Sequence, residues 1–159
     1  MRELGRAVQA EGRVYLTGGA TAVLYGWRDT TIDVDIKLIP DRDEILREIP
    51  RLKERLNLNV ELAAPSDFIP LPAGWEDRSP LISREGKLSF HHFDPVAQAL
   101  SKVERGHDQD LRDVEEMIAI GLVNPAEAMI QFEAIEPELF RFPAIDPASF
   151  RTAVEKLFT

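Results

Sequence analysis

The stretch VYLTGGATAVLYGWRDTTIDVDIKL, residues 14–38, carries the pattern that predicts the fold. A short apolar run ends in Gly18 and Gly19, the residue type that tolerates the positive φ of a tight turn. The letters ATAVLYGW then predict a helix, and residues 31–39 alternate between apolar and charged side chains, as a half-buried strand does. Residues two apart in a strand share a face, so Asp33 and Asp35 project together.

Two ionised carboxylates on one face repel each other unless a cation joins them. Mg²⁺ is the common cation for such oxygen ligands, and it completes its coordination with water and phosphates. A glycine turn that opens a helix offers backbone N–H groups to those phosphates, and Thr21 could add a hydroxyl contact. Gly18, Gly19 and Thr21 are therefore candidates for nucleotide binding.

Each feature alone also has an ordinary explanation. A glycine pair is often only a strand-to-helix turn, and two acids in a strand are often a solvated surface. Lys37 shares their face and could neutralise Asp35 directly. The order of the features, with the glycine turn, the helix and the acid pair in succession, favours a site over these explanations.

The whole chain predicts an α+β fold in a single domain of residues 1–159. A small mixed sheet of about four to five strands, covered by helices, is expected within residues 1–93, and a helical extension over residues 94–159. The predicted strands are 13–17, 31–39, 59–63 and 87–93, and the helix between the second and third should kink or split at Pro50. Residues 64–80 form the longest irregular segment.

The composition excludes several classes of function. The chain has no cysteine, which excludes disulfides, thiolate zinc sites and cysteine nucleophiles. A net charge of -9 disfavours broad binding to DNA or RNA backbones. No apolar run approaches the roughly 20 residues of a membrane span, and we expect a cytoplasmic protein.

The letters LTGGATAVL and RDTTIDVDI resemble the nucleotidyltransferase-fold superfamily related to DNA polymerase β. Its signature is a hydrophobic residue, Gly, then Gly or Ser, a helix, and Asp-hydrophobic-Asp on the next strand. Among its members the chain is most similar to small bacterial nucleotidyltransferases near the AbiEii toxin family, in which an Arg-x-Thr sequence like that at Arg28 is familiar. The resemblance implies a two-metal Mg²⁺ site for an NTP substrate, with Arg28 at the nucleotide.

The same resemblance implies a third carboxylate on a neighbouring strand, as both a metal ligand and a catalytic group. Glu61 in NVELA is the candidate, and Asp67 is the alternative. An outward-facing strand residue without a catalytic role is the other explanation for Glu61.

Residues 94–118 resemble a second AbiEii-type pattern: a lysine, an arginine, and then a helix start rich in acids. Lys102 and Arg105 match the cations and would contact the nucleotide. Asp110 and Asp113 match the acids, lie one helical turn apart, and would hold the two cations in place. Gln109 departs from the pattern, which commonly has a basic residue there. A solvated charged turn between two helices is the alternative for this segment.

Three functions remain open at this point. The first is transfer of a nucleoside monophosphate to a protein side chain, a tRNA end or a small molecule, which includes the activity of a toxin in a toxin–antitoxin pair. The second is a non-catalytic binding protein on the same fold, such as an antitoxin or adaptor. The third is a structural domain with a surface acid pair.

Overall fold

The computed structural model describes residues 1–159, and the chain divides into two compact units. The sheet unit comprises residues 1–64 and 79–93, and the helical unit comprises residues 65–78 and 94–159. All strands lie in the sheet unit, and residues 94–159 are helical, so the predicted α+β class is confirmed.

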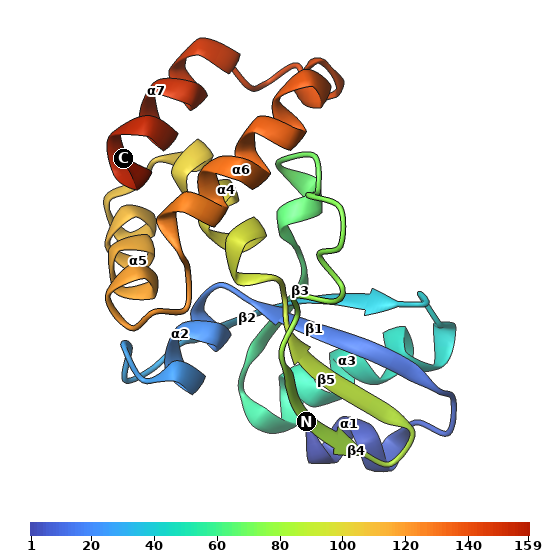
Figure 1. Cartoon of the computed structure of the whole chain (residues 1–159). Helices are drawn as coiled ribbons and strands as arrows, with labels where there is room; N and C mark the ends of the chain where they lie inside the picture. The colour runs from blue at the N-terminus through green and yellow to red at the C-terminus, as the bar shows by residue number, and fades with distance from the viewer. The chain divides into compact units, whose positions relative to one another are not determined.

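The sheet unit contains five strands in one mixed sheet, in the order β3-β2-β1-β5-β4. Strand β1 is central, pairing antiparallel with β2 and parallel with β5. Strands β2 and β3 are parallel, and β4 and β5 form an antiparallel hairpin. The elements follow in the order α1 (Arg2–Ala7), β1 (Gly12–Thr17), α2 (Gly19–Tyr25), β2 (Asp33–Ile39), α3 (Asp43–Leu56), β3 (Asn59–Leu62), β4 (Leu81–Glu85) and β5 (Leu88–His92) (Figure 1).

One face of the sheet is apolar and packs against helices α1 and α3. The alternation expected in residues 31–39 produces this face, because Ile36 and Leu38 point into the core while Asp35 and Lys37 point away from it. The core cluster of the unit consists of Leu4, Val8, Val14, Leu16, Ala20, Ile36, Leu38, Ile45, Ile49, Leu88 and Phe90. The opposite face carries the polar side chains of Asp35, Lys37 and His91, and the buried ring of Tyr15 lies among them.

The expected split of the helix at Pro50 does not occur, and one strand lies outside the four segments that the sequence analysis predicted as strands. Helix α3 runs through Pro50 without a break, because Ile45 and Ile49 on one side and Leu52 on the other anchor it to the core. These contacts outweigh the hydrogen bond that a proline removes from a helix. Strand β4 was not expected either; it forms by pairing with β5 across a turn in which Gly86 has a φ of 62°.

The helical unit has α4 at its centre, contacting α5, α6, α7 and the short helix η1. The apolar residues of α4 are buried, as are Phe132 and Phe150, whose rings meet edge to face at 5.0 Å. The elements of this unit are η1 (Pro65–Asp67), α4 (Pro95–Arg105), α5 (Asp108–Ala119), α6 (Pro125–Ile135), η2 (Glu136–Arg141) and α7 (Pro147–Phe158).

Three of these helices, α4, α6 and α7, begin with a polar residue followed by proline, as their sequences indicate. In α4 and α6 the polar side chain caps the first turn. The side chain of Asp94 accepts a hydrogen bond from the Val96 N–H at 2.9 Å, and Asn124 accepts one from the Glu127 N–H at 3.1 Å. None of the helices in either unit has the length and apolar character that crossing a membrane requires.

Candidate functional site

The glycine turn and the acid pair meet at one end of the sheet. Gly18 follows β1 and is the N-cap residue of α2, with a φ of 63° that residues with side chains rarely adopt. An ideal Cβ atom at position 18 would lie 3.1 Å from Oδ2 of Asp35. The Asp35 carboxylate therefore lies directly beside the backbone of the turn, as the motif predicts.

Gly19 allows a second close approach. A Cβ atom there would overlap the side chain of Thr31, and it would lie 3.6 Å from the carbonyl oxygen of Asp33. The Thr31 hydroxyl in turn donates to that Asp33 carbonyl at 2.9 Å. The absence of a side chain at position 19 lets the segment before β2 lie against α2.

Strand register places three predicted site residues in one neighbourhood. Asp35 of β2 is opposite Thr17 of β1 on one side and Glu61 of β3 on the other. Residues paired in register on adjacent strands lie about 4.8 Å apart and point to the same face. Asp33 is two residues before Asp35 and shares that face, which is the face away from α1 and α3.

Asn59 joins two of these acids. Its Nδ2 donates to Asp33 Oδ1 at 2.9 Å and to Glu61 Oε1 at 2.7 Å. Asp33 and Glu61 are exposed and Asp35 is half-buried, so the carboxylates are accessible to a ligand. The amide holds Asp33 and Glu61 in place and supplies a positive dipole between them.

The oxygen donors fit Mg²⁺ in their chemistry. Mg²⁺ is usually held by one or two carboxylates, with water and substrate phosphates as its other ligands, and Asp33 with Asp35 supplies such a pair. No group of three or more His, Asp or Glu side chains is gathered closely enough to hold a metal ion. Glu61 is instead bonded to Asn59, so its role as a third metal ligand stays a prediction.

The surroundings of Thr21 differ from the nucleotide contact that was expected for it. Its side chain is fully buried, and its hydroxyl donates to the Leu16 carbonyl at 3.3 Å. Its Oγ1 also lies 3.1 Å from Nδ1 of His92. A buried hydroxyl with these partners does not meet a ligand; Thr21 fixes the first turn of α2 to β1 and β5 instead.

His92 is the buried partner in this arrangement. Its ring packs against Tyr25 of α2, with the ring centroids 4.5 Å apart. Burial lowers the pKa of His92 to about 4, so the imidazole is neutral at physiological pH. When Thr21 donates its only proton to Leu16, the hydrogen of the imidazole resides on Nδ1.

Of the other predicted residues, Arg28 lies in the segment between α2 and β2, and the rest belong to the helical unit. Arg28 follows α2 and is half-buried; its main-chain N–H donates to the Ala22 carbonyl at 3.4 Å. Asp67, the alternative third acid, belongs to η1 in the helical unit. Lys102 and Arg105 are also in the helical unit, in the last turns of α4.

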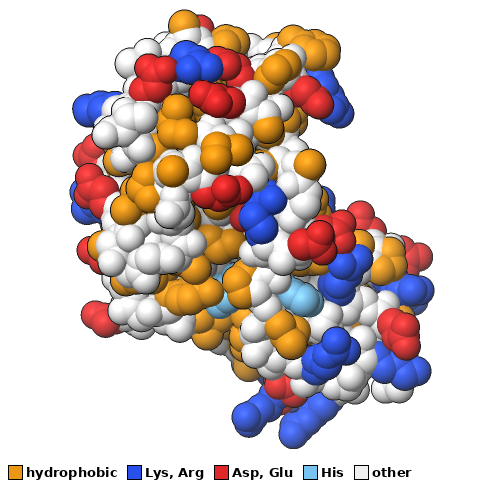
Figure 2. All heavy atoms as spheres, in the orientation of Figure 1, with side chains coloured by type: hydrophobic (Ala, Val, Ile, Leu, Met, Phe, Trp, Pro, Cys, Tyr) orange, Lys and Arg blue, Asp and Glu red, His pale blue; other side chains and the backbone are white.

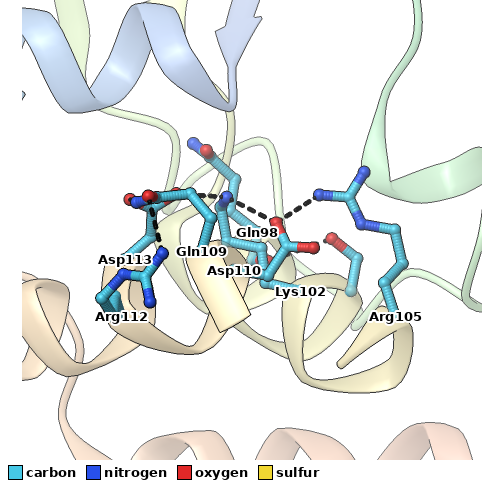
Figure 3. A network of polar contacts seen from close by, with 8 residues as sticks. Gln98, Lys102, Arg105, Gln109, Asp110, Arg112 and Asp113 are labelled. Atoms are coloured by element: carbon cyan, nitrogen blue, oxygen red, sulfur yellow. Dashed lines mark hydrogen bonds and ion pairs between the residues drawn. The ribbon is translucent and has the colours of Figure 1, made fainter. Parts of the chain in front are cut away.

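The contact expected between these two cations and two acids of α5 is present. Lys102 is 5% exposed, and its Nζ lies 3.1 Å from Asp110 Oδ1 and 2.7 Å from Asp113 Oδ2. Arg105 contacts Asp110 Oδ1 at 2.6 Å and stacks over the Phe68 ring at 5.4 Å. Figure 3 shows these side chains converging from α4 and α5.

The burial of the two cations differs in a way that matters for phosphate binding. Lys102 is enclosed and has two carboxylates as partners, whereas the side chain of Arg105 is 37% exposed. Gln109, where the pattern commonly has a basic residue, donates to Asp113 Oδ1 at 3.2 Å and so joins the same cluster. Arg105 is the better placed of the two cations to meet an anion from solvent.

Sequence reasoning did not find Asn59 or the role of His92. Asn59 stands opposite Asp33 and two residues before Glu61, so the register of two parallel strands would have been needed to recognise it. The sequence does contain an indication of the role of His92. His91 and His92 are consecutive in a strand and therefore point to opposite faces, so only one of them can lie against α2.

One comparison with known proteins found a match. A family model described as "nucleotidyltransferase of unknown function (DUF6036)" matches residues 2–134 of the chain. No curated protein and no solved structure matches it significantly.

Proposed function

The chain belongs to this family of nucleotidyltransferases of unknown function, and from that premise we propose that it transfers a nucleoside monophosphate from an NTP to a hydroxyl group. Family membership implies nucleotide binding. The observation that carries the proposal is the position of the Asp35 carboxylate beside the backbone of Gly18, with Asp33 and Glu61 on the same face.

In the proposed reaction the acceptor oxygen bonds to the α-phosphorus while the bond to the β-phosphate breaks, and pyrophosphate leaves. Bound Mg²⁺, held by Asp33 and Asp35, would neutralise the phosphate charge and orient the leaving group. Gly18 and Gly19 contribute no side chains of their own that would keep phosphate oxygens away from the turn. Glu61 is the proposed acceptor of the proton from the attacking hydroxyl.

The sign of the charges supports a metal-dependent reaction. Asp33, Asp35 and Glu61 together would repel a triphosphate in the absence of a cation, and no cationic side chain is paired with Asp33 or Glu61. Nucleotide affinity should therefore depend on Mg²⁺. The acceptor classes considered are a protein side chain, a tRNA end and a small molecule, and toxin activity belongs to the same proposal.

A test combines substrate screening with a paired substitution. Purified protein is incubated with labelled NTPs and cell lysate, with and without Mg²⁺, and label transfer is followed on gels and by chromatography. We expect Mg²⁺-dependent transfer that is lost in Asp33→Asn with Asp35→Asn. The matched control is Asp29→Asn with Asp41→Asn, which removes two exposed acids outside the site. Equal transfer by both double variants would exclude the proposed site.

A second function is a non-catalytic binding protein, such as an antitoxin or adaptor. It is favoured by the bond of Asn59 to both Asp33 and Glu61, which leaves no third free carboxylate beside the pair. Such a protein would bind an NTP with Mg²⁺ and release it unchanged. Single-turnover assays on protein with bound nucleotide separate the two functions, because only the enzyme forms pyrophosphate.

A further inference from the structure

A pocket of about 590 Å³ lies at the end of the sheet opposite to the acid pair. Three segments of the sheet unit form it: the start of β1, the end of β2 with the residues after it, and the turn between β4 and β5. Arg13 pairs with Ile39 at this end of the sheet, whereas Thr17 pairs with Asp35 at the other. Four residues of strand separate the two ends by on the order of 13 Å.

The side chains that line the pocket carry a net positive charge, although the net charge of the whole chain is negative. The cationic side chains of the pocket are Arg13, Arg42, Arg84 and Lys87, and Glu11 is its single acid. The net charge of the whole chain is -9, so cations gathered around one cavity are a local exception. In Figure 2, Lys and Arg side chains lie on the sheet unit at the lower right of the view, with Asp and Glu side chains among them.

Three of these cations, Arg42, Arg84 and Lys87, form no ion pair at the pocket. Arg42 Nε donates to the main-chain carbonyl of Glu11 at 2.9 Å, which fixes the guanidinium at the rim and leaves its charge uncompensated. Arg84 and Lys87 are exposed, and neither side chain forms an ion pair. These three cations converge from two segments, the residues after β2 and the hairpin of β4 and β5, and together they attract an anion with several charges.

The arginine content and the size of the pocket define the ligand class. Guanidinium groups match phosphate oxygens in a bidentate manner, and three of the four cations are arginines. The volume is within the range of about 300–1,000 Å³ that small-molecule sites occupy. A long nucleic acid would extend over a surface whose net charge repels it, so a compact ligand is favoured.

We propose that this pocket is a second anion site, separate from Asp33 and Asp35, which binds a small molecule carrying two or more linked phosphate groups. The site needs no metal, because its own cations supply the positive charge. It does not depend on the nucleotidyl transfer proposed above.

The test uses sodium tripolyphosphate as the probe, in a buffer with EDTA, where the acid pair has no cation to attract phosphate. Isothermal titration calorimetry measures the affinity, and amide NMR shifts locate the probe. We expect binding by the wild-type protein, with shifts at Gly12 and Gly86 and none at Gly18 and Gly19. Arg84→Gln with Lys87→Gln should weaken binding by about tenfold or more.

The control removes the same charge elsewhere in the sheet unit. Arg2→Gln with Arg47→Gln takes away two exposed arginines outside the pocket and should change the affinity by less than about twofold. Asp33→Asn with Asp35→Asn should bind the probe at least as well as wild type. No binding by wild type, shifts confined to the glycine turn, or equal loss in both basic double variants would overturn the proposal.

Discussion

The Asp35 carboxylate lies so close to Gly18 that a Cβ atom at position 18 would be only 3.1 Å from its Oδ2. Gly18 has no Cβ atom and therefore leaves room for the carboxylate. The glycine has two separate functions at this point. It adopts a positive φ of 63°, and it leaves the space beside a carboxylate open. These functions can be separated by substitution.

Gly18→Ala should lower both stability and nucleotide binding. The positive φ costs an alanine about 1–2 kcal/mol in the free energy of unfolding, and the methyl group would press on Asp35. Urea unfolding and Mg²⁺-dependent NTP titration measure the two effects. Gly121→Ala is the control, because Gly121 also has a positive φ, 74°, but no atom within 4 Å of its added Cβ. Gly121→Ala should lose stability but keep its nucleotide affinity. A similar loss of nucleotide affinity in Gly121→Ala would show that backbone strain, not the carboxylate contact, explains the effect of Gly18→Ala.

His92 should make the sheet unit less stable in acid. Its pKa is lowered to about 4 in the folded protein by burial, so the unfolded chain binds the proton more readily. The stability it contributes is complete above pH 6.5 and decreases as the pH falls towards 4, by about 3 kcal/mol in total. The unfolding free energy of wild type and of His92→Gln is measured from pH 4 to 7. Between these values it should rise more steeply with pH in wild type than in the variant.

His107→Gln is the control for this pH dependence, because His107 is exposed at the start of α5. Its unfolding free energy should follow the wild-type pH profile. If His92→Gln does so as well, the imidazole is not held neutral by burial in the folded protein.

Lys102→Met should be strongly destabilising to the helical unit. The substitution leaves Asp110 and Asp113 as buried carboxylates without their ammonium partner, which costs about 3–5 kcal/mol. Arg141→Met breaks the exposed pair with Glu138 and should cost about 1 kcal/mol or less. Urea unfolding of both variants provides the measurement, and equal small costs would show that the Lys102 cluster is weakly coupled to folding.

Glu61→Gln should lower the turnover of the proposed transfer by about a hundredfold or more while leaving the fold intact, since Glu61 is exposed. Asp67→Asn removes the alternative acid and should leave turnover within about threefold of wild type. Steady-state kinetics with a saturating acceptor compares the two. Loss of turnover in Asp67→Asn alone would assign the third carboxylate to η1.

The central strands and the glycine turn were predictable because their information is local. The alternation of residues 31–39 places Asp33 and Asp35 on one face, and this face proved to be the one away from the core. The contact between Asp35 and Gly18 followed from the same motif. These features depend on strand periodicity and on one turn, both of which can be derived from adjacent residues.

Features that depend on distant pairing were not predictable in this way. The bridge from Asn59 to Asp33 requires the register between β2 and β3, and the buried contact of Thr21 with His92 requires α2 to pack on β5. The continuity of α3 through Pro50 depends on the core beneath it. In each case tertiary packing decided between local alternatives that the sequence left open.

The helical unit is an insertion as well as an extension. Residues 65–78 leave the sheet unit after β3 and return before β4, and the chain leaves again at residue 94. A truncation after Phe93 would therefore keep residues 65–78 but remove the helices against which these fourteen residues pack. A fragment that contains only the sheet unit therefore needs two changes. The C-terminal helices are removed after Phe93, and residues 65–78 are replaced by a short flexible linker that joins Ala64 to Ser79.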